Sequence, residues 1–309
     1  MFVDKLKKQW FLIGVALCWY WGYRFPWAGE QISAHLKLLV TILMFLMGLG
    51  IGFPALRRRM GCWRETGVVL FLCYVLAPFI SFVLGRLFFF DQPDLYCGII
   101  LVGTTCTTLS TCVVFTRLAG GDDALALWLS VVTSFLCAVV MPLLLTLFLG
   151  PMVSVPVELM IRRLMLVLFL PLSAGMLLRA VLGEDRISPL GPMLTRGCAL
   201  FILAVIMAAV AKGRHLLGTS SSLAVLVTVA GLHLVLLGTS FMISRIWGFR
   251  RPARIAVLFC ASQKTLQFPT YLAVTVLDMP EAALPAVLFH VFQLVMDSAI
   301  VSHLSSQRE

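Results

Sequence analysis

The sequence predicts an all-α membrane protein that crosses the bilayer many times and forms a single membrane domain over residues 1–309. Hydrophobic residues make up 61% of the chain and charged residues 12%, whereas soluble domains have about 45–50% and about 25%. Apolar stretches near the length of a bilayer span follow one another along most of the chain. No hydrophilic block is large enough for a second, aqueous domain.

Ten apolar stretches approach or exceed the roughly 20 residues that cross a bilayer. They cover residues 10–25, 36–55, 67–88, 96–116, 124–149, 164–182, 197–211, 223–247, 255–277 and 283–304. The first and seventh are short, so counts of eight or nine stay open. Lysines precede the first stretch as in a signal peptide. However, aromatic residues stand where a small-residue cleavage site belongs, which predicts a retained helix.

The hydropathy pattern divides the chain into two similar halves, residues 9–150 and 158–304, with five stretches each. Because five is odd, the two halves must insert with opposite orientation, as inverted repeats do. The fourth stretch of each half is interrupted, by GTTCTTLSTC in 96–116 and by CASQKTLQFP in 255–277. Interrupted segments at matching positions of an inverted repeat are typical of a transporter's binding site.

Positive charge predicts the orientation. With ten spans, the side that holds both termini carries sixteen Lys or Arg residues and the opposite side carries seven. The first set is Lys5, Lys7, Lys8, Arg57, Arg58, Arg59, Arg64, Arg117, Arg179, Arg186, Arg196, Arg245, Arg250, Arg251, Arg254 and Arg308. Cytoplasmic loops are enriched in Lys and Arg, which predicts cytoplasmic termini in a plasma or inner membrane. These short basic gaps do not predict nucleic-acid binding.

The first polar interruption covers residues 103–112 and is dense in hydroxyl groups. Such side chains at membrane depth offer oxygens to a ligand or to freed backbone groups. We expect Thr105, Thr108, Thr111 and Cys112 to lie nearest a ligand. The alternative is that the hydroxyls bond to their own helix or line a close helix contact.

The second interruption places a lysine near the centre of an apolar stretch. A charge there costs roughly 2.5–3.5 kcal/mol on insertion scales and is tolerated mainly in a bundle interior or a water-filled pathway. The polar run Ser262, Gln263, Lys264 and Thr265 cannot all face one side of a helix, and Pro269 favours a break. We therefore predict an unwound backbone and an internal polar site. The alternative is that Lys264 reaches the membrane interface from a helix end.

The tenth stretch contributes a third polar group. His290, Gln293 and Asp297 are spaced three, four and seven residues apart and so share a helix face. Asp297 is the acid inside a predicted span, which makes it a candidate counter-charge for the lysine or a proton carrier. It could instead lie near the cytoplasmic interface and cap a helix end. His233, in the eighth stretch, is predicted to be a packed imidazole with satisfied nitrogens.

The sequence favours no enzyme, metal or cofactor site. A nucleophile elbow, HExxH, a P-loop and GxGxxG are all absent, and the nine cysteines show neither CxxC nor Cys/His metal spacing. Asp122 and Asp123 precede a predicted helix and are expected to cap it. An intramembrane enzyme is therefore the weakest hypothesis.

Three motifs resemble the bile acid:sodium symporter superfamily (solute carrier family 10-like). The resemblance is to its SBF-like branch, which includes bacterial symporters and the seventh vertebrate solute carrier family 10 member. The motifs are CGIILVGTTCTTLSTCVVFTRLAGGDDALAL at 97–127, FCASQKTLQF at 259–268 and FHVFQL at 289–294. A weaker match covers the first two stretches, so the resemblance extends over nearly the whole chain.

The resemblance implies ten helices in two inverted five-helix repeats. Spans 1, 2, 6 and 7 would form a panel, and spans 3–5 and 8–10 a core in which broken spans 4 and 9 cross near the bilayer midplane. The implied activity is secondary transport of a small organic anion by alternating access. A non-transporting membrane regulator that retains the fold is the alternative function.

The resemblance also locates the sodium ligands of relatives, and this chain departs from them. Thr111 and Cys112 fall where sodium-coupled relatives have a Ser-Asn pair, and Ser130 falls at a liganding threonine. Cys73, five residues before Pro78, replaces a liganding glutamine.

Two further replacements change charge. Cys260 occupies the position of a liganding glutamate and Lys264 that of a liganding glutamine. Sodium prefers hard oxygen donors, so the loss of a carboxylate and the gain of an ammonium should empty at least one site. We hypothesise that the Lys264 ammonium stands where a sodium ion sits in relatives, which makes sodium a doubtful partner. Coupling to protons or no coupling would remain, and a buried lysine can exchange protons.

Overall fold

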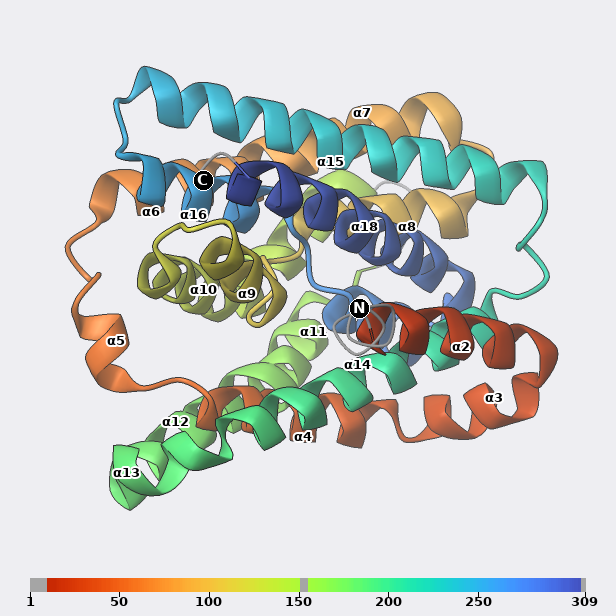
Figure 1. The fold of residues 1–309 in the computed structure, drawn as a ribbon. Helices are drawn as coiled ribbons and strands as arrows, with labels where there is room; N and C mark the ends of the chain where they lie inside the picture. Colours follow the sequence, from red (N-terminus) through yellow and green to blue (C-terminus); the bar gives the residue numbers. More distant parts are fainter. Residues whose placement is uncertain (1–9, 151–154, 307–309) are drawn as a thin grey trace.

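The computed structural model describes residues 10–150 and 155–306, and the regular elements in these ranges are all helical (Figure 1). Lys5, Lys7, Lys8 and Arg308, which entered the orientation argument, lie outside the described residues. Within these described ranges, six helices are long and apolar enough to cross a membrane. A seventh span results if α3 (Pro26–Ala34) and α4 (Leu36–Leu49), which meet at 70°, count as one. The chain is thus a multi-pass membrane protein, and ten spans stay a prediction.

Most helices follow the predicted stretches, but α3 lies in the gap between the first two, and α11 begins at residue 157, before the sixth stretch. The first half contains α2 (Trp10–Arg24), α3, α4, α5 (Phe53–Arg57), α6 (Trp63–Phe71), α7 (Ala77–Phe88), α8 (Pro93–Thr104), α9 (Thr111–Leu118) and α10 (Asp123–Leu149). The second half contains α11 (Val157–Leu164), α12 (Leu170–Leu182), α13 (Glu184–Ile187), α14 (Gly191–Lys212), α15 (Ser220–Ile246), α16 (Arg251–Ser262), α17 (Gln267–Thr275) and α18 (Leu284–Ser306). The predicted stretch 197–211 missed the first turns of α14, because the residues in those turns are more polar than the rest of the helix.

The helices pack in two groups. In the lower part of Figure 1, α4 lies against α12 and α14, and α14 also contacts α2 and α3. The upper group contains α6 to α10, α15, α16 and α18, with α15 packed on α16 and α18. We call these the α4–α14 group and the α8–α18 group.

The α4–α14 group is held together by a close crossing of two glycines. A Cβ atom on Gly48 would lie 2.2 Å from the carbonyl oxygen of Leu172, and one on Gly175 would lie 2.3 Å from that of Phe45. Small residues allow such backbone approach in membrane bundles, where helix association depends on packing. The crossing therefore requires glycine at both positions.

A proline changes the hydrogen bonding between α6 and α7. A π-helical turn, Leu72–Leu76, joins α6 to α7, and its hydrogen bonds run from each N–H to the carbonyl five residues earlier, as from Ala77 to Leu72. The next residue, Pro78, has no N–H to donate. The carbonyl of Cys73 is therefore left without a partner in the helix.

Two helices of the α8–α18 group are interrupted, as predicted. The first break, residues 105–110, separates α8 from α9, and the second break, residues 263–266, separates α16 from α17. Thr105 and Gln263 are both extended, with ψ of 161° and 139°. Pro269 lies in the first turn of α17, where its missing N–H costs nothing, whereas a helix continuing backward would clash with its ring.

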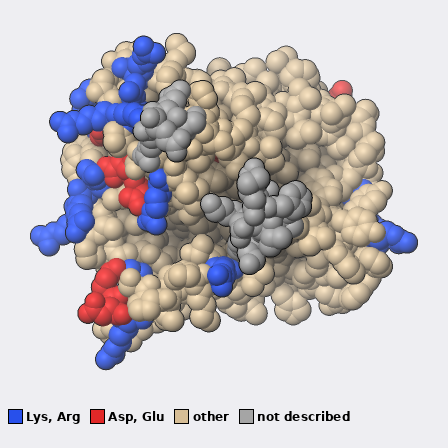
Figure 2. All heavy atoms as spheres, viewed as in Figure 1, with Lys and Arg blue, Asp and Glu red and all other residues tan. Residues whose placement is uncertain are grey.

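Charged side chains gather at the ends of the bundle. In Figure 2, Lys, Arg, Asp and Glu cluster at the left edge, where Figure 1 shows α5, α13 and the start of α16. Asp122 caps α10 by accepting from the N–H of Leu125 at 2.9 Å, as predicted. Asp123 pairs with Arg117 at 2.7 Å.

Candidate functional site

The two breaks meet inside the α8–α18 group. The backbone N–H of Thr265 in the second break donates to the carbonyl of Cys106 in the first, at 3.0 Å. Helix α9 also packs against α16. Peptide groups freed from helical bonding must find partners inside a membrane. At this crossing, each break satisfies part of the other.

The Lys264 side chain is enclosed at this crossing. Its exposed fraction is 1%, so the alternative in which it reaches the membrane interface is wrong. The ammonium donates to the carbonyl of Thr105 at 3.0 Å and to that of Cys73 at 3.3 Å. Thr105 follows the last residue of α8, where the helix dipole favours a cation, and the Cys73 carbonyl is the one that Pro78 leaves free.

The peptide of Lys264 is completed by a side-chain amide from α18. Gln293 Oε1 accepts from the Lys264 N–H at 2.8 Å, and its Nε2 donates to the Lys264 carbonyl at 3.1 Å. The same Nε2 lies 2.8 Å from His290 Nδ1. Nδ1 is therefore an acceptor, and the His290 proton lies on Nε2, a buried atom without a hydrogen-bond partner in the structure.

Asp297 pairs with a histidine and an amide. The Oδ1 atom lies 3.0 Å from His233 Nε2, and Oδ2 accepts from Gln263 Nε2 at 2.8 Å. Asp297 and His233 are both 0% exposed, and Asp297 lies in the middle of α18, so it neither meets solvent nor caps a helix end. The hydrogen-bond partners of the Lys264 ammonium are the two carbonyl oxygens, and no hydrogen bond or ion pair joins it to Asp297.

Gln263 connects Asp297 to the first break. Its Oε1 accepts from the hydroxyls of Thr108 at 2.7 Å and Thr111 at 2.8 Å, and the two hydroxyl oxygens lie 2.6 Å apart. These three oxygens share only two hydroxyl protons, so only two of their contacts are hydrogen bonds at any moment. A continuous polar path therefore runs from Thr111 through Gln263 and Asp297 to His233.

The predicted positions of sodium ligands form a sulfur-rich cluster. Cys112 Sγ lies 2.9 Å from Ser130 Oγ, which lies 4.0 Å from Cys260 Sγ. Each group also bonds to backbone: Cys112 to Thr108, Ser130 to Ala126 at 2.7 Å and Cys260 to Ala126 at 3.5 Å. Among the described residues, no group of three or more His, Cys, Asp or Glu side chains could hold a metal ion.

Two of the predicted site hydroxyls are occupied locally. Ser262 Oγ donates to the carbonyl of Leu258 in its own helix at 2.8 Å, which is the back-bonding alternative. Thr265 Oγ1 bonds to Gln267. These hydroxyls stabilise the ends of the second break.

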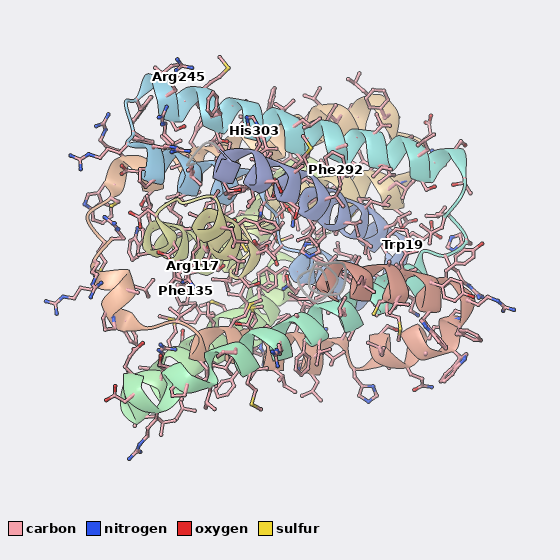
Figure 3. All side chains as sticks on the ribbon, viewed as in Figure 1. Trp19, Arg117, Phe135, Arg245, Phe292 and His303 are labelled. Atoms are coloured by element: carbon pink, nitrogen blue, oxygen red, sulfur yellow. The ribbon has the colours of Figure 1, made fainter. Side chains whose placement is uncertain are left out.

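A cavity of about 530 Å³ lies between the two helix groups. Its walls come from α4, α9, α10, α12 and α14, and Leu109 and Ser110 of the first break contribute to them. Arg117 and Arg179 add positive charge. Figure 3 shows Arg117 and Phe135 between the two groups of helices.

The predicted site residues lie behind this cavity. None of the thirteen candidates lines it, although Thr111, next to Ser110, is only partly buried. Leu109 and Ser110 line the cavity instead, and the expectation that Thr105, Thr108, Thr111 and Cys112 lie nearest a ligand stays a prediction. The sequence did not identify His233 as a partner of Asp297, because the face that α15 presents to α18 is set by packing.

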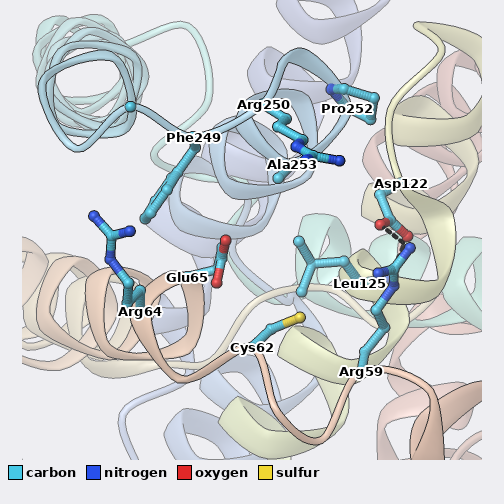
Figure 4. Close-up of a pocket in the computed structure, with 11 residues that line it drawn as sticks. Arg59, Cys62, Arg64, Glu65, Asp122, Leu125, Phe249, Arg250, Pro252 and Ala253 are labelled. Atoms are coloured by element: carbon cyan, nitrogen blue, oxygen red, sulfur yellow. Dashed lines mark hydrogen bonds and ion pairs between the residues drawn. The ribbon is translucent and has the colours of Figure 1, made fainter.

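A second cavity, of about 660 Å³, opens among the arginines at one end of the bundle (Figure 4). Arg59 pairs there with Asp122, and Arg64 donates to the carbonyl of Trp247 at 2.9 Å. Arg250 and Glu65 complete its charged lining. The first of these pairs ties the segment between α5 and α6 to the start of α10.

Comparisons with known proteins match almost the whole chain. The model of the SBF-like CPA transporter family matches residues 9–306. Sodium/bile acid cotransporter 7-B of Xenopus laevis is 25% identical, over 98% of this chain and 94% of its own length. An uncharacterized protein of Pseudomonas aeruginosa, PA2026, is 27% identical over 87% of this chain and 84% of its own.

Proposed function

Because the chain belongs to the SBF-like CPA transporter family, we propose that it is a secondary transporter of a small organic anion, working by alternating access. The observation that carries the proposal is the enclosed Lys264 ammonium at the meeting of two broken helices. Broken helices at a shared depth supply free backbone groups and helix ends to a ligand, as in other transporters.

Electrostatics favours an anion. Lys264 contributes a full positive charge with carbonyl dipoles as its hydrogen-bond partners. Arg117 and Arg179 line the neighbouring cavity, whose walls are otherwise largely apolar. An organic anion with an apolar body fits this lining. The named vertebrate relatives are sodium/bile acid cotransporters, which makes a bile acid the first probe.

We propose that the cavity between the helix groups is the substrate pathway. The α4–α14 group corresponds to the panel and the α8–α18 group to the core of the ten-span architecture with inverted repeats. In the predicted orientation the cavity opens toward the cytoplasm, because Arg117 and Arg179 belong to the side rich in positive charge. Movement of one group against the other would transfer access to the opposite face.

Sodium does not drive this proposed cycle. Cys260 replaces a carboxylate, Cys112 replaces an amide, and the ammonium of Lys264 stands where a cation would otherwise hold the crossing together. Lys264 therefore does the structural work of a sodium ion and keeps the site attractive to an anion. A non-transporting regulator would need no anion pathway, and the 530 Å³ cavity beside the first break favours transport over that alternative.

Uptake by the purified protein in liposomes tests the proposal. A labelled bile acid is supplied outside under a sodium gradient, a proton gradient or neither, and Lys264→Gln serves as the site variant. We expect saturable uptake by the wild-type protein that ignores the sodium gradient, and we expect this sodium-independent uptake to be lost in the variant. No uptake of any member of a panel of organic anions would contradict the proposed function, and uptake in proportion to the sodium gradient would contradict the role of Lys264.

A further inference from the structure

The side chains of His233 and Asp297, which we call the dyad, hold more oxygen acceptors than a neutral histidine and an ionised acid can satisfy. His233 Nδ1 lies 3.2 Å from the carbonyl oxygen of Ser262, and Nε2 lies 3.0 Å from Asp297 Oδ1. A carbonyl oxygen only accepts, so Nδ1 must carry a proton to bond there. The second contact needs a proton as well.

A neutral imidazole carries one proton and an ionised carboxylate none. With that single proton, one of the two nitrogens would face an oxygen with lone pair against lone pair. Both contacts are satisfied only if the dyad holds an additional proton, on His233 Nε2 or on Asp297 Oδ1. An unpaired buried polar contact costs about 1–3 kcal/mol, so the packing selects the protonated dyad.

We propose that the dyad is a proton-binding site, and that its proton sets the net charge of the transport site. The effect on transport rests on the proposed function, whereas proton binding itself follows from the contacts of the dyad. With the proton bound, the dyad is neutral and Lys264 leaves the site at +1. Without it, the carboxylate cancels the lysine. An anion is therefore bound together with the proton and released with it to the water on the other side.

The dyad also has a mechanical link to the substrate pathway. Asp297 Oδ2 accepts from Gln263, whose other end contacts Thr108 and Thr111 in the first break. Loss of the proton turns the His233 contact repulsive and frees the acid to move. Gln263 then carries this change to Thr111, beside the cavity.

The dyad is packed against aromatic rings and has few other titratable groups near it. The ring of His233 packs edge-on against Phe289 and Phe292 at 5.5 and 5.9 Å, and Phe292 is labelled on α18 in Figure 3. Within the cluster, the other titratable groups are Lys264 and His290 with the contacts given above, and the thiols of Cys260 and Cys112.

Charged groups on the helices packed around the dyad have contacts elsewhere or lie near helix ends. Arg64, Arg86, Arg117, Arg251 and Glu281 contact Trp247, Phe90, Asp123, Leu304 and His215, respectively. Glu65, Asp94, Arg196, Lys212 and Arg254 lie within the first two or the last turns of their helices. Arg245 lies in the last turn of α15, the helix that carries His233. Lys264 follows Gln263, the residue that donates to Asp297, and is therefore the buried cation next to a partner of the dyad.

Spectroscopy of the full-length protein tests proton binding without any substrate. The five histidines are labelled with ¹⁵N, and ring protonation is read at pH 8, where ordinary histidines are neutral. Infrared spectra report a protonated carboxyl group in the same sample. We expect either a doubly protonated ring or a carboxylic acid band, lost in both His233→Gln and Asp297→Asn.

The exposed pair of His215 and Glu281, 2.8 Å apart, provides the matched control. Glu281→Gln should leave both signals unchanged. A singly protonated His233 together with an ionised Asp297 at every pH above 5 would overturn the proposal.

A transport measurement separates this inference from the proposed function. Liposomes loaded with a pH-sensitive dye are given a bile acid outside, and we expect the lumen to acidify as the anion enters. Asp297→Asn should abolish the acidification, and Glu281→Gln should not. Anion uptake without proton movement would overturn the coupling role. The spectroscopic signal without transport of any anion would contradict the proposed function and still support the proton site.

Discussion

The ammonium of Lys264 lies 3.3 Å from the carbonyl oxygen of Cys73, the one carbonyl that Pro78 deprives of a helical partner. A proline in one span thus creates an acceptor for a lysine in another. With the Thr105 carbonyl, this contact connects three separate segments, namely the π turn and both breaks. Lys264 is therefore a structural tie as well as a source of charge.

Replacing this lysine by an apolar side chain should destabilise the fold. Lys264→Met leaves two buried carbonyls without a donor, and hydrogen bonds to charged groups are worth about 1.5–3 kcal/mol each. Thermal unfolding of the purified protein in detergent should show a clearly lower midpoint. Lys212→Met, at the end of α14, should change it little. An unchanged or raised midpoint for Lys264→Met would contradict the tie.

The side-chain amide of Gln293 should be essential for the second break. Gln293→Leu removes the partners of the Lys264 N–H and carbonyl, each costing about 1–3 kcal/mol when buried and unpaired. We expect a lower folded yield and a lower unfolding midpoint than for Gln31→Leu, at an exposed position of α3. If Gln293→Leu were as stable as that control, the break would not depend on this amide.

The glycine crossing should tolerate no larger side chain. Valine at position 175 would collide with the backbone of Phe45 and force α4 and α12 apart, and overpacking typically costs about 1–3 kcal/mol. Gly175→Val should lower stability in a thermal scan. Gly238→Val is the matched control, since a Cβ there meets no atom within 4 Å. Equal effects of the two substitutions would argue against the crossing.

Cys62, in the arginine-lined cavity, should react slowly with maleimides at neutral pH. Burial raises the pKa of its thiol, and the charge of Glu65 raises it further. Since the thiolate is the reactive form, the labelling rate should climb with pH beyond the range of an ordinary thiol. Glu65→Gln removes one raising influence and should speed labelling at pH 7.5. A slower rate in that variant would contradict the assignment.

The same cysteine tests the orientation. An impermeant maleimide should label Cys62 in inside-out vesicles and leave it unlabelled on intact cells, with Cys62→Ser as the control for the remaining thiols. Labelling from outside would reverse the predicted placement of the arginine-rich end.

Local chemistry made much of this fold predictable. The apolar stretches predicted most of the long helices, although α3 and α11 fell outside them. The run from Ser262 to Thr265 followed by Pro269 predicted the second break. The partner of Asp297 could not be predicted in this way. Periodicity places His290, Gln293 and Asp297 on one face of α18, but does not say which face of α15 meets it. His233 was expected to be a satisfied imidazole, and the structure shows that an acid satisfies it.

Sodium binding to the purified protein decides whether the Lys264 ammonium occupies the role of a sodium ion. Thermal unfolding is followed while sodium replaces choline at constant ionic strength, for the wild-type chain and for Lys264→Gln. We expect no sodium-dependent rise in the wild-type midpoint, and a rise in Lys264→Gln, where sodium takes the place of the ammonium. A saturable, sodium-specific stabilisation of the wild-type protein would contradict it.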